Sequence, residues 1–97
     1  MTSSYSPILR ECADIADERE AQYGVFTKNF QDTADIAKAM FGLEISPADC
    51  LKVLIANKYA RQRHKSKSDN LYDAINYSAM LLKLEEDELL QRTLPGE

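Results

Sequence analysis

The segment SPADCLKVLIANKYARQRH, from Ser46 to His64, decides the fold because it carries a helix start, an apolar face and a helix end. Ser46 is a typical N-cap, Pro47 suits the first helical position, and Asp49 falls in the first turn, where an acid complements the helix dipole. Apolar residues then recur at helical spacing, and cations occupy the last turn. The segment therefore predicts a helix over residues 47–64.

The same kinds of signal occur on both sides of this segment. Ser68 caps a second apolar-periodic stretch after a polar turn, Ser6-Pro7 marks a helix start, and Gly42 stands where helices commonly end. The predicted helices span residues 7–22, 27–41, 47–64 and 69–91. Short connections predict an all-α fold in which four helices pack with antiparallel sequential neighbours. We expect a single domain over residues 1–97, with flexible ends at 1–6 and 93–97.

Length and composition narrow the class of protein. A chain of 97 residues forms one small domain with a modest core, so self-association would add stability and we expect a homo-oligomer. No apolar stretch approaches the roughly 18 residues of a membrane span, and Met1 to Ser4 opens no signal peptide, so we expect a cytoplasmic protein. Cys12 and Cys50 lie at apolar helical positions without CxxC spacing, which indicates reduced core thiols.

Charges are segregated although the formal net charge is only −4. Six Lys and Arg residues lie between Cys50 and Ser68, whereas Glu85 to Glu88 is an acidic run. A helical wheel places Lys58 and Arg61 on the apolar side of their predicted helix. It also places Arg19 among the apolar residues of the predicted helix 7–22. These three cations are therefore predicted to point inward.

Buried cations need counter-charges or hydrogen-bond acceptors, and the helical wheels place few carboxylates on the inward faces. Asp73 is the one clearly inward carboxylate, and Asp69 lies at a margin. In one interpretation the cations are structural, with an Arg61–Asp73 ion pair and Lys58 near Asn76 or Tyr77. In the other, a phosphate-type anion is the missing partner.

Five motifs in order carry a family resemblance, which spans about Ile8 to Leu84. They are Arg19-Glu-Ala-Gln-Tyr23-Gly24, Asn29-Phe30, Ile45-Ser-Pro47-Ala-Asp49, Lys58-Tyr-Ala-Arg61 and Asp69 to Asp73-Ala-Ile-Asn-Tyr77. The pattern resembles a small phage and prophage helical family of unknown function. More distantly, the Tyr23-Gly24, Lys58 to Arg61 and Asp73 to Tyr77 elements are similar to a phage nucleotide-modification-associated domain and, in architecture, to all-α nucleoside triphosphate pyrophosphatases of the MazG type.

The resemblance to MazG-type enzymes implies a Mg²⁺ site made by an EExxE and an ExxD motif, because Mg²⁺ prefers several carboxylate oxygens. Asn70 stands at the first position of the ExxD motif that would end at Asp73, and the acids of the first helix mostly point outward. Only Asp69 and Asp73 remain as candidate Mg²⁺ ligands. The incomplete motif leans against an enzyme, and no catalytic residue is identified.

The resulting expectation is a phage-type protein that binds a phosphorylated ligand, specifically a nucleotide. Arg19, Lys58 and Arg61 would hold phosphate oxygens, and Asp73 would hold Arg61 or share a Mg²⁺ with Asp69. Tyr23, Asn29 and Tyr77 would orient or stack on the base.

Two alternatives stay open, a phage protein that inhibits a host defence system by protein contact and a Mg²⁺-dependent pyrophosphohydrolase. The basic run lacks a recognition-helix pattern and interleaved aromatics, which argues against nucleic acid as the partner.

Overall fold

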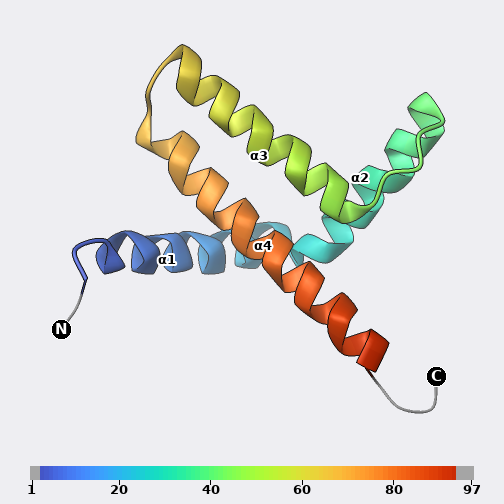
Figure 1. The fold of residues 1–97 in the computed structure, drawn as a ribbon, viewed down its shortest axis with the longest axis horizontal. Coiled ribbons are helices and arrows are strands. Elements are labelled where there is room, and N and C mark those ends of the chain that lie inside the picture. The colour runs from blue at the N-terminus through green and yellow to red at the C-terminus, as the bar shows by residue number, and fades with distance from the viewer. Residues whose placement is uncertain (1–2, 94–97) are drawn as a thin grey trace.

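A computed structural model describes residues 3–93 of the chain, and every described element is a helix (Figure 1). The helices are α1 (Ser6–Tyr23), α2 (Phe26–Phe41), α3 (Pro47–His64) and α4 (Ser68–Thr93). The all-α prediction is confirmed, and each helix end lies within two residues of the predicted one. Of the ends expected to be flexible, residues 1–2 and 94–97 lie outside the described residues, while Ser6 begins α1 and Thr93 ends α4.

Local capping explains where these helices begin and end. The backbone N–H of Asp49 donates to Ser46 Oγ at 3.0 Å, and the Ser46 N–H donates to Asp49 Oδ2 at 3.1 Å, so the predicted cap of α3 is a complete capping box. Gly42 closes α2 with a left-handed φ of 72°, a conformation that glycine adopts without strain. The predicted cap of α1 is wrong by one residue, because Tyr5 occupies that position without a side-chain hydrogen bond and Ser6 is already helical.

The α3–α4 hairpin is the central element of the fold. The two helices run side by side in opposite directions, and α2 packs against α3 and reaches α4 through its own first turns (Figure 1). The buried core lies where α2, α3 and α4 meet, and Leu51 is its fully buried residue. This core contains Phe30, Ala34, Cys50 and Leu51, with half-buried residues such as Leu54, Tyr77 and Leu81 packed against it.

An amide pair organises the turn between α3 and α4. Gln62 Oε1 accepts hydrogen bonds from the Lys67 N–H at 2.8 Å and from Asn70 Nδ2 at 3.2 Å, while Gln62 Nε2 donates to Ser66 Oγ at 3.0 Å. Asn70 is buried, with 5% of its surface exposed, so this contact also satisfies a polar group that would be costly to bury alone. Ser68, predicted as a cap, is the first residue of α4 instead.

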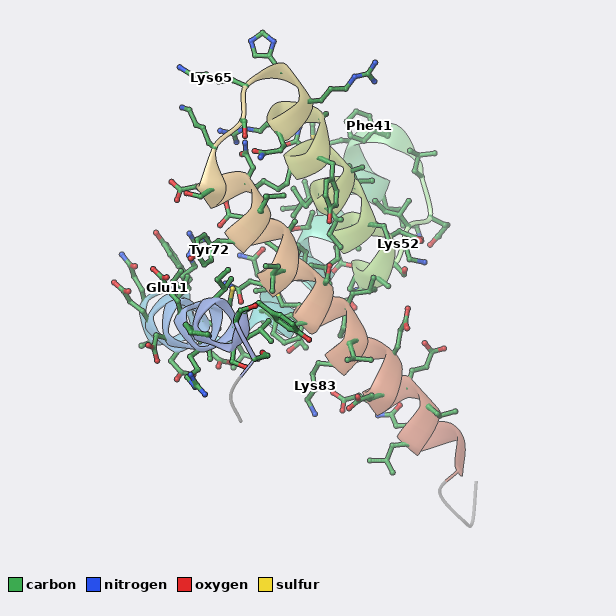
Figure 2. All side chains as sticks on the ribbon, turned by 60° about the vertical axis from the view of Figure 1, so that its left-hand side comes forward. Glu11, Phe41, Lys52, Lys65, Tyr72 and Lys83 are labelled. Carbon is green, nitrogen blue, oxygen red and sulfur yellow. The ribbon has the colours of Figure 1, made fainter. Side chains whose placement is uncertain are left out.

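Helix α1 crosses α4 and contributes least to the core. Its one buried residue is Cys12, and Tyr72 Oη donates a hydrogen bond of 2.9 Å to Glu11 Oε2 across the crossing (Figure 2). That hydrogen bond to a carboxylate raises the pKa of the Tyr72 hydroxyl. None of the helices within residues 3–93 combines the length and apolar content that crossing a membrane requires.

Candidate functional site

A groove of about 830 Å³ lies among all four helices. Its walls are the C-terminal half of α1, the N-terminal halves of α2 and α3, and the middle of α4. Buried or half-buried apolar side chains line it, among them Phe26, Phe30, Leu54 and Met80. Exposed polar side chains line it as well, among them Arg19, Asn29 and Lys83. The groove therefore combines an apolar surface with several convergent polar groups, as small-molecule sites do.

Asp73 sits beside this groove and is shared by two cations. Lys58 Nζ lies 2.9 Å from Asp73 Oδ2, and Arg19 Nη2 lies 3.4 Å from Asp73 Oδ1. The side chains of Lys58 and Asp73 are 14% and 15% exposed, whereas that of Arg19 is 51% exposed. One carboxylate thus pairs with a nearly buried ammonium and a half-exposed guanidinium, so the cluster has one more cationic than anionic side chain.

This arrangement corrects the predicted cation pairing. Asp73 pairs with Lys58 and Arg19 rather than with Arg61. Arg61 is exposed and lines a second hollow of about 410 Å³ at the α3–α4 turn, together with His64, Lys65 and Lys67. Of the three cations expected to point inward, Lys58 alone is largely buried.

The structure brings four of the seven predicted ligand-binding residues into the wall of the groove. These four are Arg19, Tyr23, Asn29 and Tyr77. Tyr77 is held against the core, because its ring meets that of Phe30 edge-on, with the centroids 6.5 Å apart. Lys58 and Asp73 lie beside the groove, because Asp73 contacts both Lys58 and the groove residue Arg19. Arg61 does not line the groove.

Asn76 and Lys83 also line the groove and were not among the predicted site residues, although their sequence carries a signal. Both lie on one polar strip of α4, seven residues apart, between apolar residues such as Met80 and Leu81. Lys83 Nζ donates to Asp87 Oδ1 at 2.8 Å, and this bond raises the pKa of Lys83. A polar strip along an apolar helix indicates water or a ligand beside it, so it pointed to this groove.

Metal ligands do not gather in the described part of the chain. Within residues 3–93 no group of three or more His, Cys, Asp and Glu side chains is placed to hold a metal ion. Asp69 is exposed at the start of α4, and Asp73, the other candidate ligand, is already engaged by two cations. Cys12 and Cys50 are free and buried, and burial raises the pKa of both thiols, which keeps them protonated at neutral pH.

Comparison with known proteins gives a family and no activity. No curated protein and no solved structure matches the chain. The family model described as a domain of unknown function (DUF6378) matches residues 7–85. The matched range contains every residue that lines the groove, and also Lys58 and Asp73 beside it. Since the match covers most of its length, the chain belongs to the DUF6378 family.

Proposed function

We propose that the groove binds a phosphorylated small molecule, specifically a nucleotide. The observation that carries this proposal is the sharing of Asp73 between Lys58 and Arg19. The shorter contact, 2.9 Å, goes to the nearly buried Lys58, which has the greater need of a counter-charge. Arg19 is half exposed and in the groove wall, so it is free to turn toward an anion while Asp73 stays paired with Lys58.

The size and lining of the groove suit a nucleoside bearing phosphate. Its volume of about 830 Å³ falls within the roughly 300–1,000 Å³ of small-molecule sites. Tyr23 and Tyr77 offer aromatic faces or edges for a base, and the side-chain amides of Asn29 and Asn76 offer donors and acceptors for the base edge. Arg19 is the guanidinium that would grip phosphate oxygens, with two parallel hydrogen bonds.

The resemblance to a phage nucleotide-modification-associated domain supports the same proposal. Of the elements that carry it, Tyr23-Gly24 and Tyr77 line the groove, Lys58 and Asp73 lie beside it, and Arg61 lies at the α3–α4 turn. A phage role that inhibits a host system remains a proposal of lower rank, because no surface of the described chain points to a particular host partner. A Mg²⁺-dependent pyrophosphohydrolase would need carboxylates beyond Asp69 and Asp73, and the described residues supply no such cluster.

The test is a thermal-shift screen of nucleoside mono-, di- and triphosphates, with and without Mg²⁺, followed by calorimetry on each hit. A nucleotide at one hundred times its Kd should stabilise the fold by about 2.7 kcal/mol. Arg19→Met should weaken binding by about tenfold or more, because it removes a charged hydrogen-bond donor. Arg10→Met is the matched control, since Arg10 is an exposed arginine of the same helix outside the groove.

The screen also separates binding from catalysis. Pyrophosphate release from a nucleoside triphosphate in the presence of Mg²⁺ would show the pyrophosphohydrolase, whereas stabilisation without turnover would show a binding protein. Absence of any nucleotide-dependent shift would refute the proposal. Equal affinities of Arg19→Met and Arg10→Met would refute the assignment of Arg19 to the phosphate.

A further inference from the structure

Helix α4 carries a second, mostly apolar face on which Ile75 is half-buried and the leucines are exposed in the single chain. We define the leucine stripe as Leu71, Ile75, Ser78, Leu82, Glu85 and Leu89, whose spacing alternates between four and three residues. At about 100° per residue, these positions fall within an arc of roughly 80°. Leu71, Leu82 and Leu89 are 41%, 57% and 62% exposed. Alternating spacings of three and four place apolar side chains along one seam, which is the pattern of helices that pack against another helix.

The stripe does not belong to the groove or to the contacts of α4 within the chain. Asn76 and Lys83, which face the groove, lie about 120° and 100° around the helix from the stripe at Leu82, and Tyr72, which meets α1, lies about 80° away. The α3 side of α4 is marked by buried Asn70 and Ala74. Exposed leucines aligned along one face of a helix are typical of a surface that packs against another helix, so this face calls for a partner.

The chain exposes more surface than a compact monomer of its mass. The accessible surface is 7621 Å², whereas a compact monomer of this mass exposes about 5,600 Å². The radius of gyration is 15.6 Å, against about 12.5 Å for a compact domain of this length. The chain is therefore more extended than a compact monomer, and part of its apolar surface is open to a partner.

The charges at the two ends of α4 select the partner and its direction. At one end lies the basic turn, defined as Arg63, Lys65 and Lys67, and none of these cations forms an ion pair among residues 3–93. Toward the other end lie Glu85 and Glu86, which also form no direct ion pair there. Figure 2 shows Lys65 at the tip of the hairpin and Lys83 far along α4. Two copies packed antiparallel bring each basic turn to the acidic segment of the other, whereas parallel copies bring like charges together.

We propose that α4 pairs antiparallel with α4 of a second copy of this chain through the leucine stripe, with the basic turn of each copy facing Glu85 and Glu86 of the other. The interface is isologous, so each contact occurs twice about a two-fold axis. It leaves the groove open, and it therefore stands independently of nucleotide binding.

The first test measures self-association of the full chain by sedimentation equilibrium. The wild-type chain should be a dimer, and Leu82→Gln should raise the dimer Kd at least about tenfold, because the change removes an exposed leucine of the stripe from both copies at once. Ile36→Gln is the matched control, since Ile36 on α2 is also 57% exposed but lies outside the stripe. A monomeric wild-type chain, or a dimer weakened by Ile36→Gln and not by Leu82→Gln, would overturn the proposal.

The second test fixes the direction of pairing with two charge-reversed chains. Lys65→Glu/Lys67→Glu is acidic at both ends of the stripe, and Glu85→Lys/Glu86→Lys is basic at both ends, so each variant alone should dimerise at least about tenfold more weakly than the wild type. An equimolar mixture should form the heterodimer, because antiparallel pairing then restores attraction at both ends. A mixture that associates no better than its components would overturn the antiparallel arrangement, and circular dichroism of each variant verifies that it is folded.

Discussion

Asp73→Asn tests whether the pair of Asp73 with Lys58 is a core interaction. The change removes the carboxylate 2.9 Å from Lys58 Nζ and leaves a side chain that is 14% exposed without its counter-charge. Breaking a fully buried pair costs about 3–5 kcal/mol. Here residual exposure and the remaining amide oxygen lower the expected loss to about 2 kcal/mol. The contact of 3.4 Å to half-exposed Arg19 adds about 0.5 kcal/mol or less.

This loss is measurable in a domain of 97 residues. A loss of about 2 kcal/mol should lower Tm by roughly 8–16 °C, and urea unfolding followed by circular dichroism gives the free energy directly. Protein concentration must be held constant, because the stability of a dimer depends on it.

Two further variants make the Asp73 experiment decisive. Asp32→Asn removes an exposed partner of Lys28 at 3.0 Å and should cost about 0.5 kcal/mol or less. Adding Lys58→Met to Asp73→Asn removes the uncompensated charge and should recover at least about 1 kcal/mol. A core role for the Asp73–Lys58 pair is contradicted if Asp73→Asn lowers the free energy of unfolding no more than Asp32→Asn does. It is also contradicted if adding Lys58→Met restores none of the lost stability.

The remaining predictions concern the start of α3 and the two thiols. Ser46→Ala should lower the free energy of unfolding by about 1 kcal/mol in urea, with exposed Ser4→Ala as a control that leaves it unchanged. Hydrogen bonds from Ser46 lower the pKa of Asp49 below its usual 3.8, so its contribution to stability is present above that pH and disappears as pH falls through the lower folded value. Asp49→Asn should therefore flatten the loss of stability below about pH 4, and a slope equal to that of the wild type would contradict this. Cys12 and Cys50 should react with a thiol reagent rapidly in urea and slowly in the native state, and equal rates would show that neither is protected.

The helices were predictable because their signals are local, whereas the partners of the charges were not. The capping box at Ser46 and the left-handed Gly42 depend on a few neighbouring residues, so sequence alone places α3 and the end of α2. A helical wheel gives only the direction of a side chain, not whether another element lies there. Arg61 points as the apolar residues of α3 do, but it lies near the end of the helix, beside the turn rather than the core.

In the candidate site, too, the residues were predictable from the sequence but their positions relative to one another were not. Arg19, Tyr23, Asn29 and Tyr77 were found from spaced motifs, and the structure brings them to one groove. Their common location depends on how α1 and α2 cross the hairpin, which no local pattern encodes. Lys83 was not predicted because it belongs to none of these motifs, and only the packing of the helices shows that it lines the groove.

Helix α1 makes few contacts with the rest of the chain, and this affects how easily it separates from the other helices. Helix α1 has one buried residue, Cys12, and is linked to α4 by the Tyr72–Glu11 hydrogen bond and by the contact of Arg19 with Asp73, whereas α3 and α4 form the most extensive contact among the described helices. Elements with few buried contacts open locally at a lower free energy than the whole domain. Backbone amides of α1 should therefore exchange hydrogen for deuterium well before those of α3. Since α1 supplies Arg19 and Tyr23 to the groove, a bound nucleotide would slow exchange in α1 most, which makes ligand capture and the docking of this helix a single linked equilibrium.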